Sequence, residues 1–309
     1  MPRTIFVVGS SSGIGLEIVR LFSSKGWNVV AASRNPSASE ELQALQSQNA
    51  ARLLLVALEL TDQDTFAPAL EAAIRTYSTI DVLLNNAGIN FLGAFELLSQ
   101  EQLRKQLEVN FFGPAQLTRL AIPYLRSSPT ETREQSLIIS IGSGSGHFAI
   151  PLFSYYTASK FAFEGLTEAL HHELAPQGIV VKNVVPVGGI KGTKFGANNL
   201  PEAEPLLVSS LMGQQLDLSG EEPDRRKVLE KYVAEGARTM GKTMTLSDQA
   251  EGAKSAADVA AVVWEAVEAG DGSFRYFVGA EGNPFVEARY GGAVWNDEKY
   301  MNKTRQFFA

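Results

Sequence analysis

The chain has 309 residues, of which 45% are hydrophobic and 20% are charged, a composition typical of a globular protein. Its 27 basic and 34 acidic side chains give a net charge of −7, which would repel a polyanion, so we expect no nucleic-acid partner. The absence of cysteine excludes disulfides, thiolate zinc sites and a cysteine nucleophile, and we expect no metal.

The amino-terminal sequence Met1-Pro2-Arg3 runs directly into a strand-like segment, without the apolar stretch and cleavage site of a signal peptide. No apolar run reaches the roughly 18 residues of a membrane-spanning helix. We therefore expect a cytoplasmic protein without a membrane partner.

Short β-branched segments alternate with longer amphipathic segments along the first two-thirds of the chain, which is typical of βαβ units around a buried parallel sheet. The predicted strands are Thr4–Val8, Asn28–Ala32, Arg52–Leu58, Ile80–Leu84, Ser136–Ile141 and Val180–Val185. The predicted helices span residues 13–25, 39–48, 64–77, 99–126 and 155–175. Right-handed crossovers give an α/β fold, with a Rossmann-type, doubly wound parallel sheet flanked by helices.

The segment 195–249 differs from the preceding chain, because Gly, Pro and Glu interrupt its short helical pieces. Substrate loops of α/β sheets commonly follow a late strand, so we interpret this segment as a helical substrate lid. Its charged run Glu221–Lys231 also fits a solvated helix face, the plainer alternative.

A helix over Ala256–Ala269 and a strand over Phe274–Val278 would complete the sheet. The segment 283–309 is rich in aromatic residues, and we expect it to pack over an exposed edge or into a subunit interface. The chain is therefore predicted to form one domain over residues 1–309, with this segment as a C-terminal extension.

A glycine-rich turn ends the first predicted strand and opens the first predicted helix. Its residues are Gly9, Ser10, Ser11, Ser12, Gly13, Ile14 and Gly15. Glycine permits a tight turn and lets backbone N–H groups approach a pyrophosphate at the positive end of the helix dipole. The position between strand and helix favours a dinucleotide-phosphate site over a plain turn.

Tyr156 and Lys160 are four residues apart, so both side chains share one face of a helix. A free tyrosine has a pKa of about 10, and a nearby ammonium lowers this pKa by stabilising the phenolate. Tyr156 could then protonate a carbonyl oxygen as hydride arrives, or take the alcohol proton in reverse. Ser143 could hydrogen-bond the same oxygen. The alternative is a core tyrosine beside a solvated lysine.

Four motifs, in order and at family spacing, resemble those of the short-chain dehydrogenase/reductase family. They are the turn spacing GxxxGxG, the NNAG segment 85–88, Asn110, and the YxxxK segment 156–160 with Ser143 thirteen residues upstream. The resemblance runs from Arg3 to about Lys194 and returns weakly near 274–279.

The resemblance implies the catalytic set Asn110, Ser143, Tyr156 and Lys160. Lys160 would also hold the nicotinamide ribose, and Asn110 would help to keep a water that relays protons to Lys160. Dimers and tetramers are usual in the family, so we expect a homodimer or a homotetramer.

The resemblance also implies a set of cofactor contacts. They are Gly9, Ser11, Ser12, Gly13, Ile14, Gly15, Ser33, Arg34, Glu59, Leu60, Asn86, Ala87, Gly88, Tyr156, Lys160, Pro186, Gly188, Gly189, Ile190 and Thr193. Three positions depart from the family pattern. Val8 replaces a common threonine, Glu59 replaces the aspartate that usually meets adenine, and Val187 follows the proline in place of glycine.

The end of the second strand favours NADP(H) over NAD(H). Ser33 stands where an NAD enzyme usually has an acidic residue for the ribose 2′-OH, and Arg34 follows it. A guanidinium pairs with a 2′-phosphate, which an aspartate would repel. The alternative for Arg34 is an ordinary exposed arginine.

Two loops border the substrate pocket in the family. The predicted pocket residues in them are Asn90, Phe91, Ser143, His147 and Phe153. This set predicts an apolar carbonyl compound as substrate, with His147 shaping the pocket rather than taking part in chemistry.

The sequence as a whole predicts an NADP(H)-dependent carbonyl reductase or alcohol dehydrogenase, which transfers hydride between nicotinamide and an apolar ketone or secondary alcohol. One alternative is a catalytically silent NADP-sensing regulatory protein, a class that commonly lacks the tyrosine or the lysine. Another is an isomerase or dehydratase that uses the same tyrosine.

Overall fold

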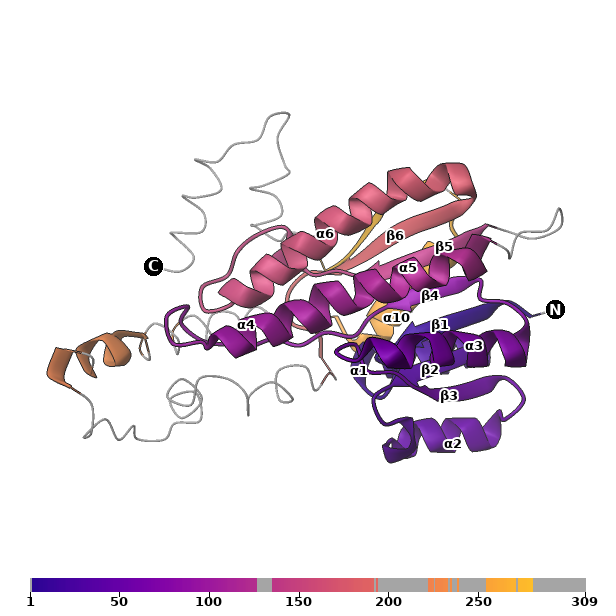
Figure 1. Ribbon diagram of the computed structural model, residues 1–309, viewed down its shortest axis with the longest axis horizontal. Helices are drawn as coiled ribbons and strands as arrows, with labels where there is room; N and C mark the ends of the chain where they lie inside the picture. The colour runs from indigo at the N-terminus through magenta and orange to yellow at the C-terminus, as the bar shows by residue number, and fades with distance from the viewer. Residues whose placement is uncertain are drawn as a thin grey trace.

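The computed structural model describes residues 2–126, 135–191, 193, 222–224, 226–232, 234, 238, 254–270 and 272–279. These residues form a seven-stranded sheet of order β3-β2-β1-β4-β5-β6-β7, in which every neighbouring pair is parallel (Figure 1). The strands are β1 (Thr4–Val8), β2 (Asn28–Ser33), β3 (Leu53–Ala57), β4 (Val82–Asn85), β5 (Ser136–Ile141), β6 (Ile179–Pro186) and β7 (Arg275–Val278). The strand order reverses between β1 and β4, so the predicted doubly wound fold is confirmed.

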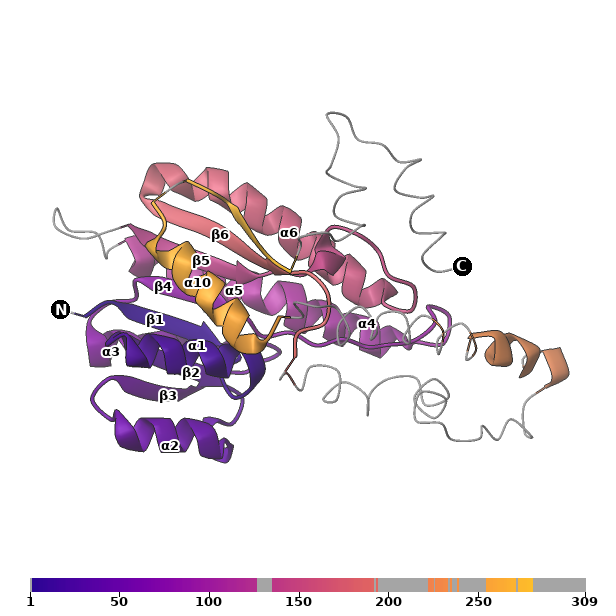
Figure 2. The same cartoon turned by 180° about the vertical axis from the view of Figure 1, so that it is seen from behind.

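Helices cover both faces of this sheet (Figures 1 and 2). On one face lie α1 (Gly13–Ser24), α2 (Glu40–Gln48) and α10 (Ala256–Glu268). On the other lie α3 (Phe66–Tyr77), α5 (Gly113–Arg126) and α6 (Ser154–Leu174), with α4 (Gln100–Leu107) preceding α5. Because both faces are buried, the strands are apolar nearly throughout, as the sequence pattern indicated.

Two separate hydrophobic cores fix these layers. In the first, Phe22 of α1 packs edge-on against Trp27 and against Trp264 of α10, with both centroid separations 5.2 Å. In the second, Phe66 of α3 and Leu117 of α5 are fully buried against the opposite face of the sheet. Edge-to-face aromatic pairs add to the free energy gained from apolar burial, so this contact anchors α10 to α1.

Local sequence sets where two of the helices begin. Ser99 and Gln102 form a capping box at the start of α4, and Ser255 and Asp258 form another at the start of α10. Each box satisfies backbone N–H groups that the helix leaves without partners.

The helix predicted over 99–126 is present as one helical segment from Gln100 to Arg126, and it contains one feature that the sequence did not indicate. A π-helical turn, Glu108–Phe112, separates α4 from α5. A single extra residue of this kind rotates the following helix and commonly occurs at functional sites. Here it turns Asn110 into the protein, where its side chain is buried. The amphipathic pattern of the sequence did not reveal this extra residue.

Parts of the predicted lid 195–249 and all of the predicted extension 283–309 lie outside the described residues. Of the lid, residues 226–232 are helical; Leu229 is buried, and the Tyr232 hydroxyl donates a hydrogen bond to Glu96. Among the residues described, no helix combines the length and the apolar character needed to cross a membrane.

Candidate active site

The carboxyl ends of the parallel strands bring the predicted site residues to one edge of the sheet. The glycine turn follows β1, the NNAG segment follows β4, Ser143 follows β5, and the loop with Gly188 follows β6. In doubly wound sheets this edge, at the point where the strand order reverses, is where ligands bind.

The glycine turn has a shape that only glycine can supply. Gly9 and Gly13 adopt φ values of +79° and +54°, in the left-handed region. A Cβ on Gly15 would lie 2.1 Å from the Gly9 carbonyl oxygen. The Asn86 amide donates to that oxygen at 2.9 Å, and Ala87 packs so closely that a Cβ on Gly9 would lie 2.8 Å from it. The NNAG segment therefore braces the turn in place of the threonine that Val8 replaces.

The end of β2 presents a hydroxyl and a cation side by side. Ser33 is buried, and among the described residues its hydroxyl oxygen has no hydrogen-bond partner. The neighbouring Arg34 side chain is 82% exposed, with Nε 4.0 Å from Glu59 Oε2. Glu59 also accepts a hydrogen bond from the Thr61 N–H at 3.1 Å. An exposed ion pair of this length is weak, so the guanidinium can turn to an anion.

The loop after β6 reaches back over the glycine turn. Gly188 adopts φ +93°, and the Thr193 hydroxyl donates to the Ile190 carbonyl at 3.0 Å. A Cβ on Gly13 would lie 3.5 Å from the Thr193 side chain. The other predicted cofactor residues lie at the same edge of the sheet. Ser11 and Ser12 are in the glycine turn and Ile14 is in the first turn of α1. Leu60 follows β3, Pro186 ends β6, and Gly189 is in the loop after it.

Helix α6 carries Tyr156 and Lys160 one turn apart, both buried. Lys160 Nζ donates to the Ile141 carbonyl at the end of β5 at 3.0 Å and lies 5.9 Å from the centroid of the Tyr156 ring. Ser143 precedes the short 3₁₀ turn Gly144–Gly146, where its Oγ accepts from the Ser145 N–H at 3.1 Å, and it also hydrogen-bonds Tyr156. The structure thus brings the three predicted catalytic groups together.

Burial controls the protonation of this pair. It raises the pKa of Tyr156 to about 12, although the hydrogen bond with Ser143 acts to lower it. It lowers the pKa of Lys160 to about 8, although the Glu164 carboxylate acts to raise it. The sequence argument expected the ammonium to lower the tyrosine pKa. In the structure, desolvation outweighs the hydrogen bond with Ser143, so the pKa is raised and Tyr156 is a phenol at neutral pH.

Asn110 lies beside this pair because of the π-helical turn. Its side chain accepts from the Ile89 N–H and donates to the Ile89 carbonyl, both at 2.9 Å, and it donates to Ser159 Oγ at 3.0 Å. A Cβ on Gly88 would lie 3.4 Å from Asn110 Oδ1 and 3.9 Å from Lys160 Nζ. The predicted fourth member therefore faces the same spot as Lys160.

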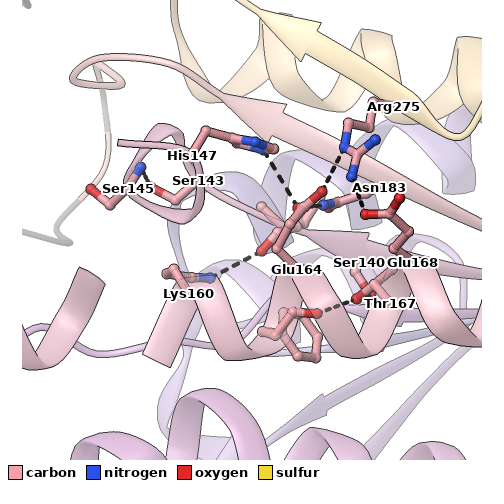
Figure 3. Close-up of polar contacts among 12 residues, drawn as sticks. Ser140, Ser143, Ser145, His147, Lys160, Glu164, Thr167, Glu168, Asn183 and Arg275 are labelled. Atoms are coloured by element: carbon pink, nitrogen blue, oxygen red, sulfur yellow. Dashed lines mark hydrogen bonds and ion pairs between the residues drawn. The ribbon is translucent and has the colours of Figure 1, made fainter. Parts of the chain in front are cut away.

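The predicted pocket residues divide into two groups. The Phe153 ring lies 6.4 Å from the Tyr156 ring, and Asn90 is buried with no partner for its Oδ1 in the described part of the chain. Phe91 and His147, by contrast, are each 2% exposed. Phe91 packs in a small core, and the His147 ring faces Glu164 (Figure 3). Their burial does not separate them from the site, because Asn90 and Tyr156 are also buried, so all of these stay predicted pocket residues.

Sequence reasoning missed a polar cluster one helical turn beyond Lys160, formed by Glu164, Asn183 and Arg275 (Figure 3). Glu164 had a signal, because it stands four residues after Lys160 and so shares its helix face. Arg275 had none, because it reaches Glu164 from β7, 111 residues further along the chain.

Comparison with known proteins identifies the family. The chain is 33% identical over 202 residues to an uncharacterised oxidoreductase of Schizosaccharomyces pombe, a match that covers 65% of each chain, just under two-thirds of that relative. It is 32% identical over 235 residues to a 3-ketodihydrosphingosine reductase of Bacteroides thetaiotaomicron, covering 76% of this chain and 78% of the relative.

Solved structures agree with these relatives. A short-chain dehydrogenase of Streptomyces avermitilis superposes with a TM-score of 0.69 and 25% identity, covering 99% of this chain and 93% of that one. Residues 3–203 match the family described as short chain dehydrogenase, as the four motifs predicted. The chain belongs to the short-chain dehydrogenase family of oxidoreductases.

Proposed function

We propose that the protein is an NADP(H)-dependent oxidoreductase that reduces an apolar ketone to a secondary alcohol and catalyses the reverse oxidation. The observation that carries this proposal is the meeting of Ser143, Tyr156 and Lys160 at the ligand-binding edge of the sheet. The similarity to a protein named as a reductase of a 3-keto compound supports carbonyl chemistry.

The residues at the edge fit a nicotinamide dinucleotide. The turn at Gly9 and Gly13 leaves a cradle that a side chain would fill, and α1 begins at Gly13 with its positive end toward this cradle. The Ser33 hydroxyl, which has no hydrogen-bond partner among the described residues, and the exposed Arg34 guanidinium suit a ribose 2′-phosphate, which is why we propose NADP(H). When bound, the nicotinamide supplies or accepts the hydride.

Each side chain then has a definite task in reduction. Tyr156 is protonated at neutral pH and gives its phenolic proton to the carbonyl oxygen as the carbon receives hydride, which forms the alcohol. Ser143 donates a hydrogen bond to the same oxygen and stabilises the developing negative charge. Lys160, held by the Ile141 carbonyl, places a positive charge near the ring and favours loss of the proton.

The position of Asn110 supports a fourth role. Its contacts with Ile89 and Ser159 hold the amide rigidly opposite Gly88, where it shares a small space with Lys160. We propose that Asn110 keeps a water there, through which Lys160 exchanges protons with solvent.

The test is a turnover assay of the purified full chain with NADPH and a panel of aliphatic, aromatic and long-chain 3-keto ketones. Tyr156→Phe removes the proton donor and should lower kcat by about 100-fold or more. Tyr155→Phe is the matched control, because the neighbouring hydroxyl only donates to the Leu98 carbonyl at 3.4 Å. No turnover by the wild type, or equal rates for the wild type and Tyr156→Phe, would overturn the proposal.

A further inference from the structure

A buried cluster of polar side chains surrounds Glu164, one helical turn beyond Lys160 (Figure 3). Arg275 Nε donates to Glu164 Oε1 at 2.6 Å, and Asn183 Nδ2 donates to Oε2. His147 Nε2 lies 3.5 Å from the same Oε2. These partners come from β7, β6 and the turn after β5, so the carboxylate is held from three separate segments.

Such a cluster is costly unless the charge is well paired. Burial alone would raise the pKa of Glu164, but hydrogen bonding and attraction from His147 and Arg275 outweigh it and hold the pKa below its ordinary value. Glu164 is therefore a carboxylate at neutral pH. It shares the helix face of Lys160, where it opposes the lowering of the Lys160 pKa by burial.

Arg275 does not neutralise Glu164 alone. Arg275 divides its guanidinium between two carboxylates, because its NH2 group also donates to Glu168 at 2.6 Å. Arg275 and Lys160 thus balance Glu164 and Glu168, while His147 is the remaining titratable group in contact with Glu164. Removing Glu164 would take away the buried carboxylate nearest Lys160 on its helix and leave Arg275 paired with the half-exposed Glu168.

We propose that Glu164 is a positioning residue for the reaction: its carboxylate, fixed by Arg275 and Asn183, keeps Lys160 in the ammonium form. The same contacts join β7 to the helix that carries Tyr156. Strand β7 also accepts, through the Val278 carbonyl, a hydrogen bond at 2.8 Å from Val187 at the start of the loop after β6. This inference rests on the proposed function for its catalytic meaning, but the charge of Lys160 can be measured without turnover.

The experiment follows the Lys160 side chain by NMR in the full chain labelled with carbon-13 lysine. Its signal is the one absent from Lys160→Met. In Glu164→Gln the pH midpoint of this signal should fall by at least about 0.5 unit, because a buried carboxylate near the ammonium is lost. Glu168→Gln is the matched control; this neighbouring carboxylate pairs with the same Arg275 but is 50% exposed, and its loss should leave the midpoint nearly unchanged.

Arg275→Met is an independent second variant, in which the pH midpoint of Lys160 is not expected to fall. It removes a cation that competes for Glu164, so the Lys160 midpoint should stay or rise. An unchanged midpoint in Glu164→Gln, equal shifts in Glu164→Gln and Glu168→Gln, or a fall in Arg275→Met would overturn the proposal. Thermal unfolding identifies any variant that does not fold.

Activity then separates this inference from the proposed function. In a turnover assay, the alkaline limb of kcat/KM for reduction should move to lower pH in Glu164→Gln by the same amount as the NMR midpoint. A chain without any turnover would refute the proposed function while the NMR result still decides the role of Glu164.

Discussion

The half of the site that follows β1 and β4 is built mainly from backbone, whereas the half that follows β5 and β6 is built from buried side chains. In the first half, Gly9, Gly13 and Gly15 work by having no side chain, and Asn86 braces them. In the second, Lys160 and its neighbours are held by partners far away in sequence. The difference teaches that the proposed nucleotide half has no room for a side chain at Gly9 or Gly15. In the proposed catalytic half, burial makes the protonation of each group depend on its charged neighbours.

The largest effect is expected from a substitution in the glycine turn, in the half of the site that is built mainly from backbone. In Gly15→Ala the new Cβ would lie 2.1 Å from the Gly9 carbonyl oxygen, so the turn must move. We expect stability to fall by about 1–3 kcal/mol and NADPH affinity to fall at least about tenfold. Denaturant unfolding and a fluorescence titration with NADPH measure the two effects.

Gly165→Ala is the matched control for that substitution. Gly165 lies in α6, and a Cβ there would meet nothing within 4 Å among the described residues. Alanine should therefore stabilise the helix, by up to about 1 kcal/mol, without affecting NADPH. If both alanines behaved alike, the close approach at Gly15 would not limit the turn.

The next largest effect tests how much a buried side chain of β6 stabilises the half of the molecule that contains β6, β7 and α10. Lys182 is 1% exposed, and its Nζ donates to the carbonyls of Ala266 and Ala269 at 2.8 and 2.6 Å and to the Tyr276 hydroxyl at 3.1 Å. The two carbonyls end α10, so the ammonium caps that helix. Lys182→Met keeps the length but removes the donors, and should cost about 1–3 kcal/mol of stability.

Lys227→Met is the control for Lys182, because the Lys227 side chain is 73% exposed and its ammonium lies 3.7 Å from the exposed Asp224. Its loss should change stability by less than about 1 kcal/mol. Both are measured by urea unfolding at constant pH. Equal losses in the two variants would show that the buried ammonium does not hold the carboxyl end of α10.

The smallest effect concerns the one place where the nucleotide half uses an exposed side chain. Arg34→Ala should raise the KM for NADPH by about tenfold and leave the KM for NADH unchanged, because only NADPH carries the 2′-phosphate. Arg20→Ala, which removes an arginine paired with Glu17 at 3.5 Å on α1, should change neither value. Equal increases for both cofactors in Arg34→Ala would contradict the 2′-phosphate contact.

Much of the fold was predictable because its signals are local. The strands Thr4–Val8 and Ser136–Ile141 have the predicted bounds, since buried parallel strands are continuous apolar runs. The segment 99–126 was predicted less well, because a π-helical turn changes helix register by one residue and barely alters the apolar pattern.

The candidate site also contains residues that could be predicted from local sequence and residues whose contacts could not. Tyr156, Lys160 and Ser143 could be named from spacing, because positions four apart on a helix share a face whatever the rest of the chain does. The contacts of Phe91 with a small core and of His147 with Glu164 could not be predicted, since loop position does not determine which way a side chain turns.

The sequence by itself determined the parallel sheet, the glycine turn and the spacing of the tyrosine and the lysine, because each depends on residues that are close in the chain. Only the tertiary structure decided that burial raises the pKa of Tyr156 and lowers that of Lys160. It alone brought Arg275 from β7 to Glu164. Desolvation and charge pairing depend on what surrounds a group in space, and those surroundings come from every part of the folded chain.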